Sequence, residues 1–259
     1  MKLFATDYDG TLRTKEKIAE EDIEAIKEWR KQGYIFAIVT GRSMESIIEQ
    51  QKLNNFEFDY IVGNNGGVIY DQNLKLLKEE CFKFDAALEI IKFIETIDCA
   101  SYVINDGFHR CKCTINSKQT DYKYANVVSA ISKEEIMNNK KIAQLVISLE
   151  DNEYALKVTK EINERFKEYA TAYTNVNCID IAPVGVSKYE GVNYIAKLTK
   201  ICEDEVYTIG DSYNDLSMIK AYKGDCVATS HEAIIKESNK VYSSVGKAIY
   251  DKLKKSIKN

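Results

Sequence analysis

Short apolar runs and helically spaced apolar positions alternate along the first third of the chain. Each continuous apolar run predicts a buried strand, and each amphipathic stretch predicts a helix. Strands followed by helices are typical of parallel pairing, so we expect a doubly wound α/β sheet of the Rossmann-like kind. The predicted strands are 2–6, 34–39, 59–62 and 68–70, and the predicted helices are 20–32, ending at Gly33, and 43–53, capped by Ser43.

The middle of the chain, residues 82–182, has a different pattern: its short predicted strands alternate apolar and polar positions in place of continuous apolar runs. The polar stretch around Tyr122 and Tyr124 looks mobile. This section predicts a compact α+β unit with mostly antiparallel strands, and Pro183, the only proline, marks its end. The predicted helices are 86–97 and 153–166, and the predicted strands are 101–105, 108–114, 142–149, 170–173 and 178–181.

The strand–helix rhythm returns after Ser187. The simplest architecture is therefore one α/β core, split in sequence into 1–81 and 183–259, that carries residues 82–182 as an inserted α+β domain. The predicted helices of this last part are 189–199, 214–222, 231–237 and one at the C-terminus, and the predicted strands are 206–210, 226–228 and 240–242.

Composition narrows the class of protein. The chain is 45% hydrophobic and 29% charged, which provides a real core and argues against disorder. A net charge of −4 favours no nucleic-acid partner. Seven cysteines without a regular framework, and no apolar stretch approaching ~20 residues, predict a reduced, cytoplasmic protein with no membrane partner.

Two acidic pairs follow predicted strands near opposite ends of the chain. Asp7 and Asp9 lie in DYDGT, and Asp211 and Asp215 lie in GDSYND. Ligands of doubly wound sheets bind outside the carboxyl ends of the strands, so we expect these carboxylates to meet there. Clustered carboxylate oxygens suit a hard cation, and Mg²⁺ is the expected cofactor.

Phosphoryl transfer needs placement and charge neutralisation, and the chain has a candidate for each part. Asp7 is the candidate nucleophile, which would form an aspartyl phosphate, and Asp9 is the candidate general acid and base. Thr40 offers a hydroxyl at a second strand end, and Lys188 offers a cation for the phosphate. Mg²⁺ held by Asp7 and Asp211 would screen the repulsion between a phosphate and the nucleophile.

Four ordered motifs, DYDGT, VTGR, VSKYEG and GDSYND, resemble those of the haloacid dehalogenase (HAD) superfamily. The resemblance covers the whole predicted core. The insert lies between the second and third motifs, which resembles a C2-type cap. With TGR and the NGG beginning at Asn65, the chain resembles the Cof-type, subclass IIB, phosphatases.

The resemblance implies a role for each motif residue. Asp7 would be nucleophile and metal ligand, Asp9 acid/base and, through its backbone carbonyl, a metal ligand, and Asp211 a further metal ligand. Asp215 would fix Lys188 or a metal-bound water, and Asn65 would line the rim with Arg42. The implied phosphate-binding residues are Tyr8 through its backbone N–H, Thr40, Gly41, Arg42, Lys188 and Asn214.

The expected function is Mg²⁺-dependent hydrolysis of a small phosphorylated metabolite by a monomer or weak homo-oligomer. Sugar phosphates come first among the expected substrates, followed by nucleotide-like monophosphates such as flavin mononucleotide and pyridoxal phosphate. The alternatives are a phosphomannomutase-like phosphotransferase and a non-catalytic sensor of phosphorylated ligands.

Each of these residues also has a purely structural explanation. Asp7 and Asp9 could form an ordinary turn, Lys188 could be a surface lysine, and Asp211 with Asp215 could only cap the following helix. Another open question concerns three residues that alternate along one predicted strand of the insert. They could bind a metal, contact the substrate through the histidine, or simply pack; they are His109, Cys111 and Cys113.

Overall fold

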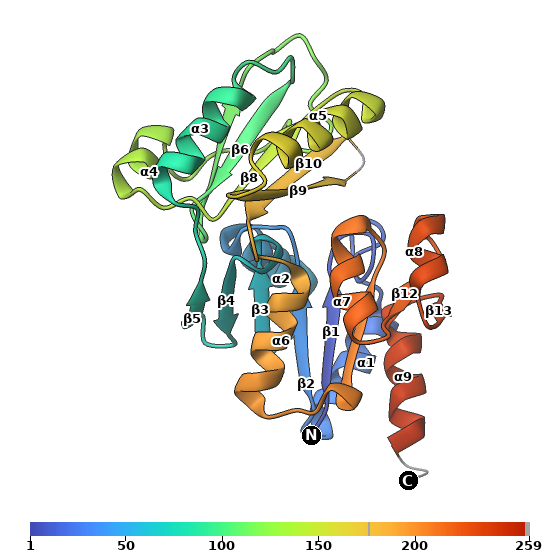
Figure 1. Ribbon diagram of the computed structural model, residues 1–259. Coiled ribbons are helices and arrows are strands. Elements are labelled where there is room, and N and C mark those ends of the chain that lie inside the picture. Colours follow the sequence, from blue (N-terminus) through green and yellow to red (C-terminus); the bar gives the residue numbers. More distant parts are fainter. Residues whose placement is uncertain (176, 257–259) are drawn as a thin grey trace.

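The computed structural model describes residues 1–175 and 177–256. Two β-sheets divide these residues into a lower α/β layer and an upper α+β layer, which meet at the carboxyl ends of the lower strands (Figure 1). The doubly wound core and the inserted cap expected from the sequence are confirmed as architecture. The boundaries at residues 81/82 and 182/183 stay a prediction.

The core sheet has the strand order β13-β12-β11-β1-β2-β3-β4-β5. Strands β13 to β3 pair in parallel, whereas β4 and β5 continue the sheet antiparallel at one edge. The strands are β1 (Leu3–Asp7), β2 (Ile35–Val39), β3 (Tyr60–Gly63), β4 (Val68–Asp71), β5 (Leu76–Glu79), β11 (Val206–Gly210), β12 (Asp225–Val227) and β13 (Val241–Tyr242).

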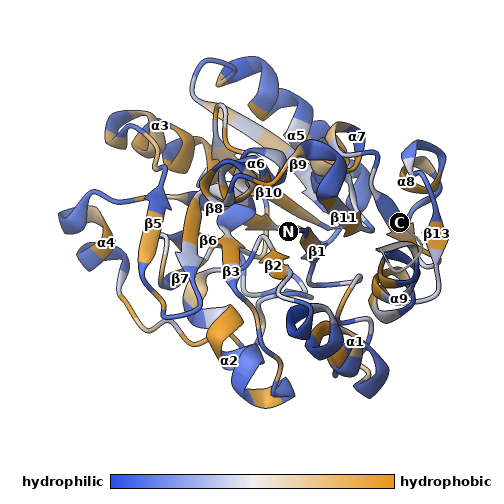
Figure 2. Ribbon diagram, turned by 90° about the horizontal axis from the view of Figure 1, so that it is seen from below, coloured by the Kyte–Doolittle hydropathy of each residue, from blue (hydrophilic) through white to orange (hydrophobic). Residues whose placement is uncertain are grey.

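Helices cover both faces of this sheet. One face carries α1 (Glu20–Lys31), α2 (Met44–Asn54) and α9 (Val245–Ser256), which contribute to the hydrophobic cluster that contains Trp29. The other face carries α6 (Lys188–Thr199) and α7 (Leu216–Ala221), and α8 (Glu232–Glu237) packs against α7 and β12. The central strands are accordingly apolar and the helices turn polar sides outward (Figure 2), as burial on both sheet faces requires.

Local sequence explains where α1 begins and ends. Its first turn holds Glu20, Glu21 and Asp22, and its last turn holds Arg30 and Lys31, which complements the helix dipole. Gly33 follows with a φ of +74°, the left-handed conformation that favours glycine after a helix. The predicted helix end is therefore confirmed.

The cap is a five-stranded antiparallel sheet of order β7-β6-β8-β10-β9 with helices on one face. Its strands are β6 (Ser101–Asn105), β7 (Arg110–Thr114), β8 (Gln144–Ser148), β9 (Ala170–Asn175) and β10 (Cys178–Pro183). Its helices are α3 (Phe84–Ile94), α4 (Lys133–Asn139) and α5 (Asn152–Arg165). The opposite sheet face turns toward the core (Figure 1). Side chains of this face, among them Val103, Asn105 and Asp180, line the roof of the cavity between the layers.

The structure departs from the sequence-based expectations in several elements. Strand β5 and helix α4 were not expected, and the predicted helix 214–222 begins as a 3-10 turn, Tyr213–Asp215, before α7. Ser43 precedes α2 as expected, but its side chain makes no capping hydrogen bond. Two further 3-10 turns, Asn64–Gly66 and Glu203–Glu205, complete the described elements.

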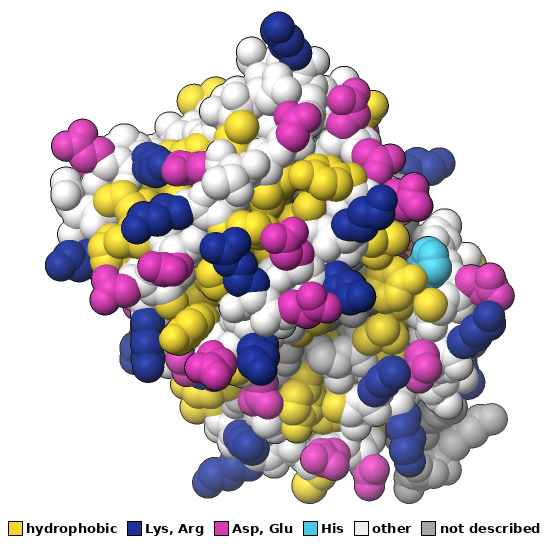
Figure 3. All heavy atoms as spheres, turned by 45° about the horizontal axis from the view of Figure 1, so that its top comes forward, with side chains coloured by type: hydrophobic (Ala, Val, Ile, Leu, Met, Phe, Trp, Pro, Cys, Tyr) yellow, Lys and Arg dark blue, Asp and Glu magenta, His cyan; other side chains and the backbone are white. Residues whose placement is uncertain are grey.

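The surface mixes both signs of charge. On the face shown in Figure 3, basic and acidic side chains are interspersed among hydrophobic ones. Among the described residues, no helix combines the length and the apolar character needed to cross a membrane.

Candidate active site

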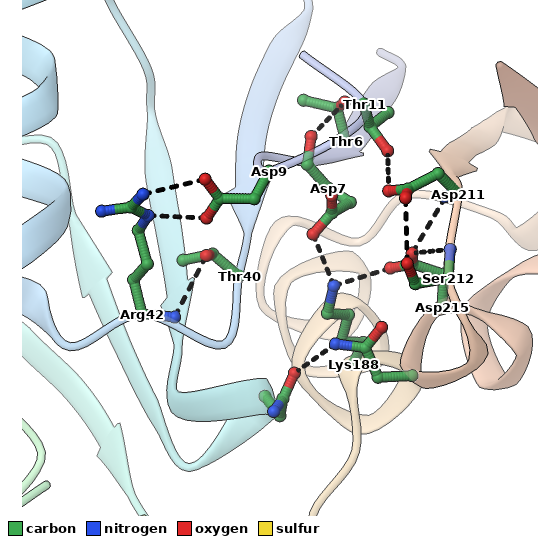
Figure 4. A network of polar contacts seen from close by, with 12 residues as sticks. Thr6, Asp7, Asp9, Thr11, Thr40, Arg42, Lys188, Asp211, Ser212 and Asp215 are labelled. Atoms are coloured by element: carbon green, nitrogen blue, oxygen red, sulfur yellow. Dashed lines mark hydrogen bonds and ion pairs between the residues drawn. The ribbon is translucent and has the colours of Figure 1, made fainter. Parts of the chain in front are cut away.

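The parallel core delivers the motif residues to one edge of the sheet. Asp7 is the last residue of β1, Thr40 directly follows β2, and Asp211 directly follows β11. Lys188 is the first residue of α6, on the chain that returns from the cap. Residues from opposite ends of the sequence therefore face one another (Figure 4), as the sequence predicts.

Lys188 is a buried cation that joins two carboxylates. Its side chain is only 1% exposed, and its Nζ donates to Asp7 Oδ1 at 2.6 Å and to Asp215 Oδ1 at 2.7 Å. Burial alone would lower the pKa of Lys188, but the charges of Asp215 and Asp7 raise it above its ordinary value. The interpretation of Lys188 as a surface lysine is therefore wrong.

Asp215 organises the loop after β11. Its Oδ2 accepts hydrogen bonds from the backbone N–H groups of Asp211 at 3.0 Å and Ser212 at 2.9 Å, while Oδ1 holds Lys188. Both oxygens are thus engaged, which makes Asp215 a positioning residue. Asp215 therefore both caps the turn that precedes α7 and holds Lys188, while a role in catalysis stays a prediction.

Three carboxylates share this small volume with a single ammonium group. Asp7, Asp211 and Asp215 each offer an oxygen, and these atoms lie within 4.8 Å of one another. Burial raises the pKa of Asp7 well above its usual range; Lys188 opposes this rise, and Asp215 and Asp211 add to it. Burial, followed by the charge of Asp215, likewise raises the pKa of Asp211. Such crowding of like charges is relieved by a bound cation.

One oxygen in this cluster lacks a partner. Asp7 Oδ2 is buried and accepts no hydrogen bond from any described residue. The carboxylate of Asp211, in contrast, is oriented by the hydroxyls of Thr11 at 2.7 Å and Ser212 at 2.9 Å. A hard divalent cation fits this donor set, because it would satisfy the orphaned oxygen and the excess negative charge together.

The glycine of DYDGT leaves room for Asp211. Gly10 has a φ of +88°, and a Cβ added to it would lie 2.5 Å from Asp211 Oδ2. Only glycine combines this backbone conformation with so close an approach. The first motif therefore shapes the site through its backbone as well as through its carboxylates.

Asp9 lines the same cavity as Asp7 and is paired with Arg42 (Figure 4). The guanidinium donates from Nε to Asp9 Oδ2 at 2.6 Å and from Nη2 to Asp9 Oδ1 at 2.8 Å. Burial favours the neutral acid, but this pairing outweighs it, so the pKa of Asp9 lies below its ordinary value. Arg42 also lies over the ring of Tyr8, whose buried side chain packs in the core.

A chain of side-chain hydrogen bonds connects the turn after β3 and the fourth motif to the cap. Asp180 Oδ2, on β10, accepts from Asn65 Nδ2 at 3.1 Å, and Asn65 Oδ1 accepts from Asn214 Nδ2 at 3.0 Å. Because a carboxylate only accepts, it fixes the orientation of both amides. Asn65 is buried by these contacts, so its expected place on the rim is wrong.

Gly41 and Thr40 pass beside this chain of amides. A Cβ at Gly41 would lie 3.2 Å from Asn65 Nδ2 and 3.3 Å from Asp180 Oδ2. The hydroxyl of Thr40 accepts from the backbone N–H of Arg42 at 3.1 Å. The loop after β2 is therefore held close to both the phosphate-site candidates and the cap.

These groups open into one cavity of about 730 Å³ between core and cap. Lys188 and Asp215 are buried and are not among the residues that line it. Seven of the expected site residues line the cavity: Asp7, Asp9, Thr40, Gly41, Arg42, Asp211 and Asn214. Cap residues that sequence reasoning missed line its roof, among them Asn105, Arg110, Lys123 and Asp180.

One of the missed residues had a sequence signal. Asp180 is a lone carboxylate in the apolar strand CIDIAP, and an isolated buried charge is a pointer to function. The other missed residues lie in polar or mixed stretches, where nothing in the sequence distinguishes a cavity wall from ordinary surface.

The three alternating residues of the cap do not gather around a metal. Cys111 and Cys113 pack with the hydrophobic core of the cap, on the sheet face that carries the helices. His109 lies before β7, where its Nδ1 is 3.1 Å from Asp106 Oδ2. Neither a shared metal site nor a substrate contact by His109 is supported, because none of the three lines the cavity.

The fold and the convergence of four motifs define a hydrolase of the HAD type. The family model described as haloacid dehalogenase-like hydrolase matches residues 4–251, and the chain belongs to that family. The expected family, its Cof-type subclass and the expected phosphatase-type enzyme are thereby confirmed.

Several relatives are similar over nearly their whole lengths. A 5-amino-6-(5-phospho-D-ribitylamino)uracil phosphatase of Bacillus subtilis is 23% identical, over 92% of this chain and 88% of its own. A HAD/COF-like hydrolase from Plasmodium vivax has a TM-score of 0.78 at 26% identity, covering 98% of this chain and 95% of its own. A subclass IIB sugar phosphatase has a TM-score of 0.79 at 20% identity, with 99% of each chain covered, and this likeness concerns the fold.

Proposed function

We propose that this hydrolase is a Mg²⁺-dependent phosphatase that cleaves a small phosphorylated metabolite through an aspartyl phosphate on Asp7. One observation carries the proposal. Asp7 has one oxygen held by the buried Lys188, and its other oxygen is buried without a partner at a carboxylate cluster in the cavity. A carboxylate that a buried cation holds in place, with one oxygen free of hydrogen bonds, supports the roles of metal ligand and nucleophile at this position.

The residues that would hold Mg²⁺ are Asp7 and Asp211 through their carboxylates and Asp9 through its backbone carbonyl. Asp215 supports this set indirectly, because its own oxygens are engaged by Lys188 and by the loop backbone. When bound, the cation neutralises the carboxylate cluster and the phosphate charge, so that an anionic nucleophile can approach an anionic ester.

In the first step, an Asp7 oxygen attacks phosphorus, and the bond from phosphorus to the leaving oxygen breaks. Asp9 donates a proton to that departing oxygen. In the second step, Asp9, now a carboxylate, takes a proton from water, whose oxygen attacks phosphorus and displaces Asp7. The products are an alcohol and inorganic phosphate, and both carboxyl groups return to their starting states.

The phosphate oxygens would be bound from several sides of the cavity floor. Lys188 supplies the cation, Thr40 a hydroxyl, and Asn214 the N–H that its contact with Asn65 leaves free. Arg42 would turn part of its guanidinium from Asp9 to the phosphate. The backbone N–H groups of Tyr8 and Gly41 complete the proposed set.

The cavity volume supports a small-molecule substrate, since about 730 Å³ lies within the usual range for such sites. Sugar phosphates and nucleotide-like monophosphates fit this volume. The seven cysteines are free thiols, which supports a reduced, cytoplasmic location.

Turnover of p-nitrophenyl phosphate, measured with Mg²⁺ and with a chelator, tests the reaction. We expect Mg²⁺-dependent release of phosphate and its loss in Asp7→Asn, with the fold retained by circular dichroism. Substantial activity in Asp7→Asn would refute the nucleophile assignment. Added sugar acceptors distinguish the phosphotransferase, which would form a new phosphate ester in place of inorganic phosphate.

A further inference from the structure

The polar stretch 116–131 of the cap, expected to be mobile, is tied to the cap sheet by one carboxylate. Asp121 Oδ2 accepts from Ser101 Oγ at 2.7 Å and lies 2.8 Å from Lys112 Nζ, and Asp121 Oδ1 accepts from Ser148 Oγ at 2.8 Å. These partners come from three neighbouring strands, β6, β7 and β8. The segment is thus fixed to the sheet face that turns toward the core.

The same anchor fixes the residues that follow Asp121. The backbone N–H of Tyr124 donates to Asp121 Oδ1 at 2.9 Å, and the backbone carbonyl of Tyr124 accepts from Lys112 Nζ at 2.6 Å. The Tyr124 side chain packs on Val103, Val146 and Cys178, which lie on the sheet face that Asp121 covers. Residues 121–124 therefore form a rigid support at the cavity roof.

Lys123 lies on this support and lines the same cavity as Asp7 and Asp9. Its amine makes no hydrogen bond or ion pair with any of the described residues, and lies only over the neighbouring Tyr124 ring, 5.7 Å from its centre. The other cations of the cavity wall are engaged: Arg42 with Asp9, Arg13 with Gln50 and Asp9, and Arg110 with Ser46 and Glu49.

The position of Lys123 places it on the side of the leaving group. The phosphate-site candidates all belong to the core, whereas Lys123 belongs to the cap that faces them. Asp9, which would protonate the leaving oxygen, and Asp180 of the roof line the same cavity as Lys123. A substrate group beyond the leaving oxygen would therefore extend toward the cap wall that carries Lys123.

We propose that segment 116–131 selects the substrate and that Lys123 binds an anionic group, a carboxylate or a second phosphate, on the leaving group. This inference rests on the proposed phosphatase function and narrows its substrate class to esters whose alcohol part is itself an anion. Asp121 is the positioning residue, because it holds the backbone that carries Lys123.

Matched substrate pairs test the assignment. Each pair differs chiefly in one anionic group: 6-phosphogluconate with glucose 6-phosphate, and 3-phosphoglycerate with glycerol 3-phosphate. One charge-assisted hydrogen bond predicts a preference for the acid of about tenfold in kcat/KM. Lys123→Met should reduce this ratio to near one and Lys123→Arg should retain it, while Lys118→Met, at an exposed position of the same segment, should leave it unchanged.

Asp121→Asn tests the anchor. We expect the acid-to-neutral ratio to fall mainly through KM, with faster hydrogen exchange confined to residues 116–131. A uniform loss of activity toward both members of a pair would overturn the positioning role.

The inference and the proposed function fail in different ways. A wild-type enzyme that hydrolyses p-nitrophenyl phosphate but treats both members of each pair alike overturns the inference only, and so does a preference that survives Lys123→Met. A wild-type protein without Mg²⁺-dependent phosphatase activity overturns the proposed function.

Discussion

Arg42 binds the carboxylate of Asp9 in a bidentate manner, donating from Nε to Oδ2 at 2.6 Å and from Nη2 to Oδ1 at 2.8 Å. Asp9 is the proposed general acid and base, and Arg42 is a proposed phosphate ligand. The side chains that would perform these two roles are therefore in direct contact before substrate binds. An incoming phosphate competes with Asp9 for the guanidinium. Substrate binding and release of the acid/base would then be linked events.

Arg42→Lys tests this link, because lysine keeps the charge but lacks the planar fork. We expect kcat/KM to fall by about tenfold or more, as loss of a bidentate charged contact predicts. The double variant with Asp9→Asn should lose less than the product of the single effects, because the two residues act together. Fully multiplicative losses would show that Arg42 and Asp9 act independently.

Removal of Mg²⁺ should lower stability as well as activity. A ligand at about 100 times its dissociation constant stabilises the native state by about 2.7 kcal/mol. We expect Mg²⁺ to raise the melting temperature of the wild type, and this rise to disappear in Asp211→Asn. Asp204→Asn, at an exposed position before β11, is the matched control and should keep the full shift. An undiminished shift in Asp211→Asn would exclude this carboxylate as a ligand.

Lys188→Met should destabilise the metal-free protein, because it leaves the buried carboxylates of Asp7 and Asp215 without their ammonium partner. Breaking a buried ion pair from one side typically costs about 3–5 kcal/mol. Urea unfolding in the presence of a chelator measures the loss. Lys197→Met, on the exposed side of the same helix, should change the unfolding free energy by less than about 0.5 kcal/mol. Equal effects of the two substitutions would contradict the structural role of Lys188.

Gly66→Ala should destabilise the protein, because Gly66 lies against the backbone of Ser187, where the chain returns from the cap to the core. Gly66 has a φ of +110°, and a Cβ there would overlap the carbonyl oxygen of Ser187, the residue before Lys188. Backbone strain and the clash together predict a loss of more than about 2 kcal/mol. Gly33→Ala is the matched control: its φ is +74°, but nothing lies within 4 Å of the added Cβ, so only the conformational cost of about 1 kcal/mol applies. Similar melting temperatures for the two variants would show that the loop yields to the clash.

The local pattern of apolar runs and motifs was sufficient to predict the core and most of its candidate site residues. Strand β1 and Asp7 could be predicted because a continuous apolar run ends at a motif, and strand ends meet in a parallel sheet. Strand β5 was missed because its LLKE sequence is half exposed at the sheet edge, where neither apolar pattern develops. The order of segment 116–131 was missed for a different reason. A polar loop looks mobile in sequence, and the Ser101 and Ser148 partners of Asp121 are set only by strand register.

The ammonium group of Lys188, which joins Asp7 to Asp215, has a consequence for the order in which the cluster forms during synthesis. The three residues of this cluster are Asp7 of β1, Lys188 of α6 and Asp215 of the loop after β11. In the sequence, the cap separates Asp7 from the other two. A nascent chain that has emerged only through the cap carries Asp7, the proposed nucleophile, but not Lys188, which binds its carboxylate. The cluster is therefore completed only after the chain beyond the cap has been made, when Lys188 joins Asp7 to Asp215.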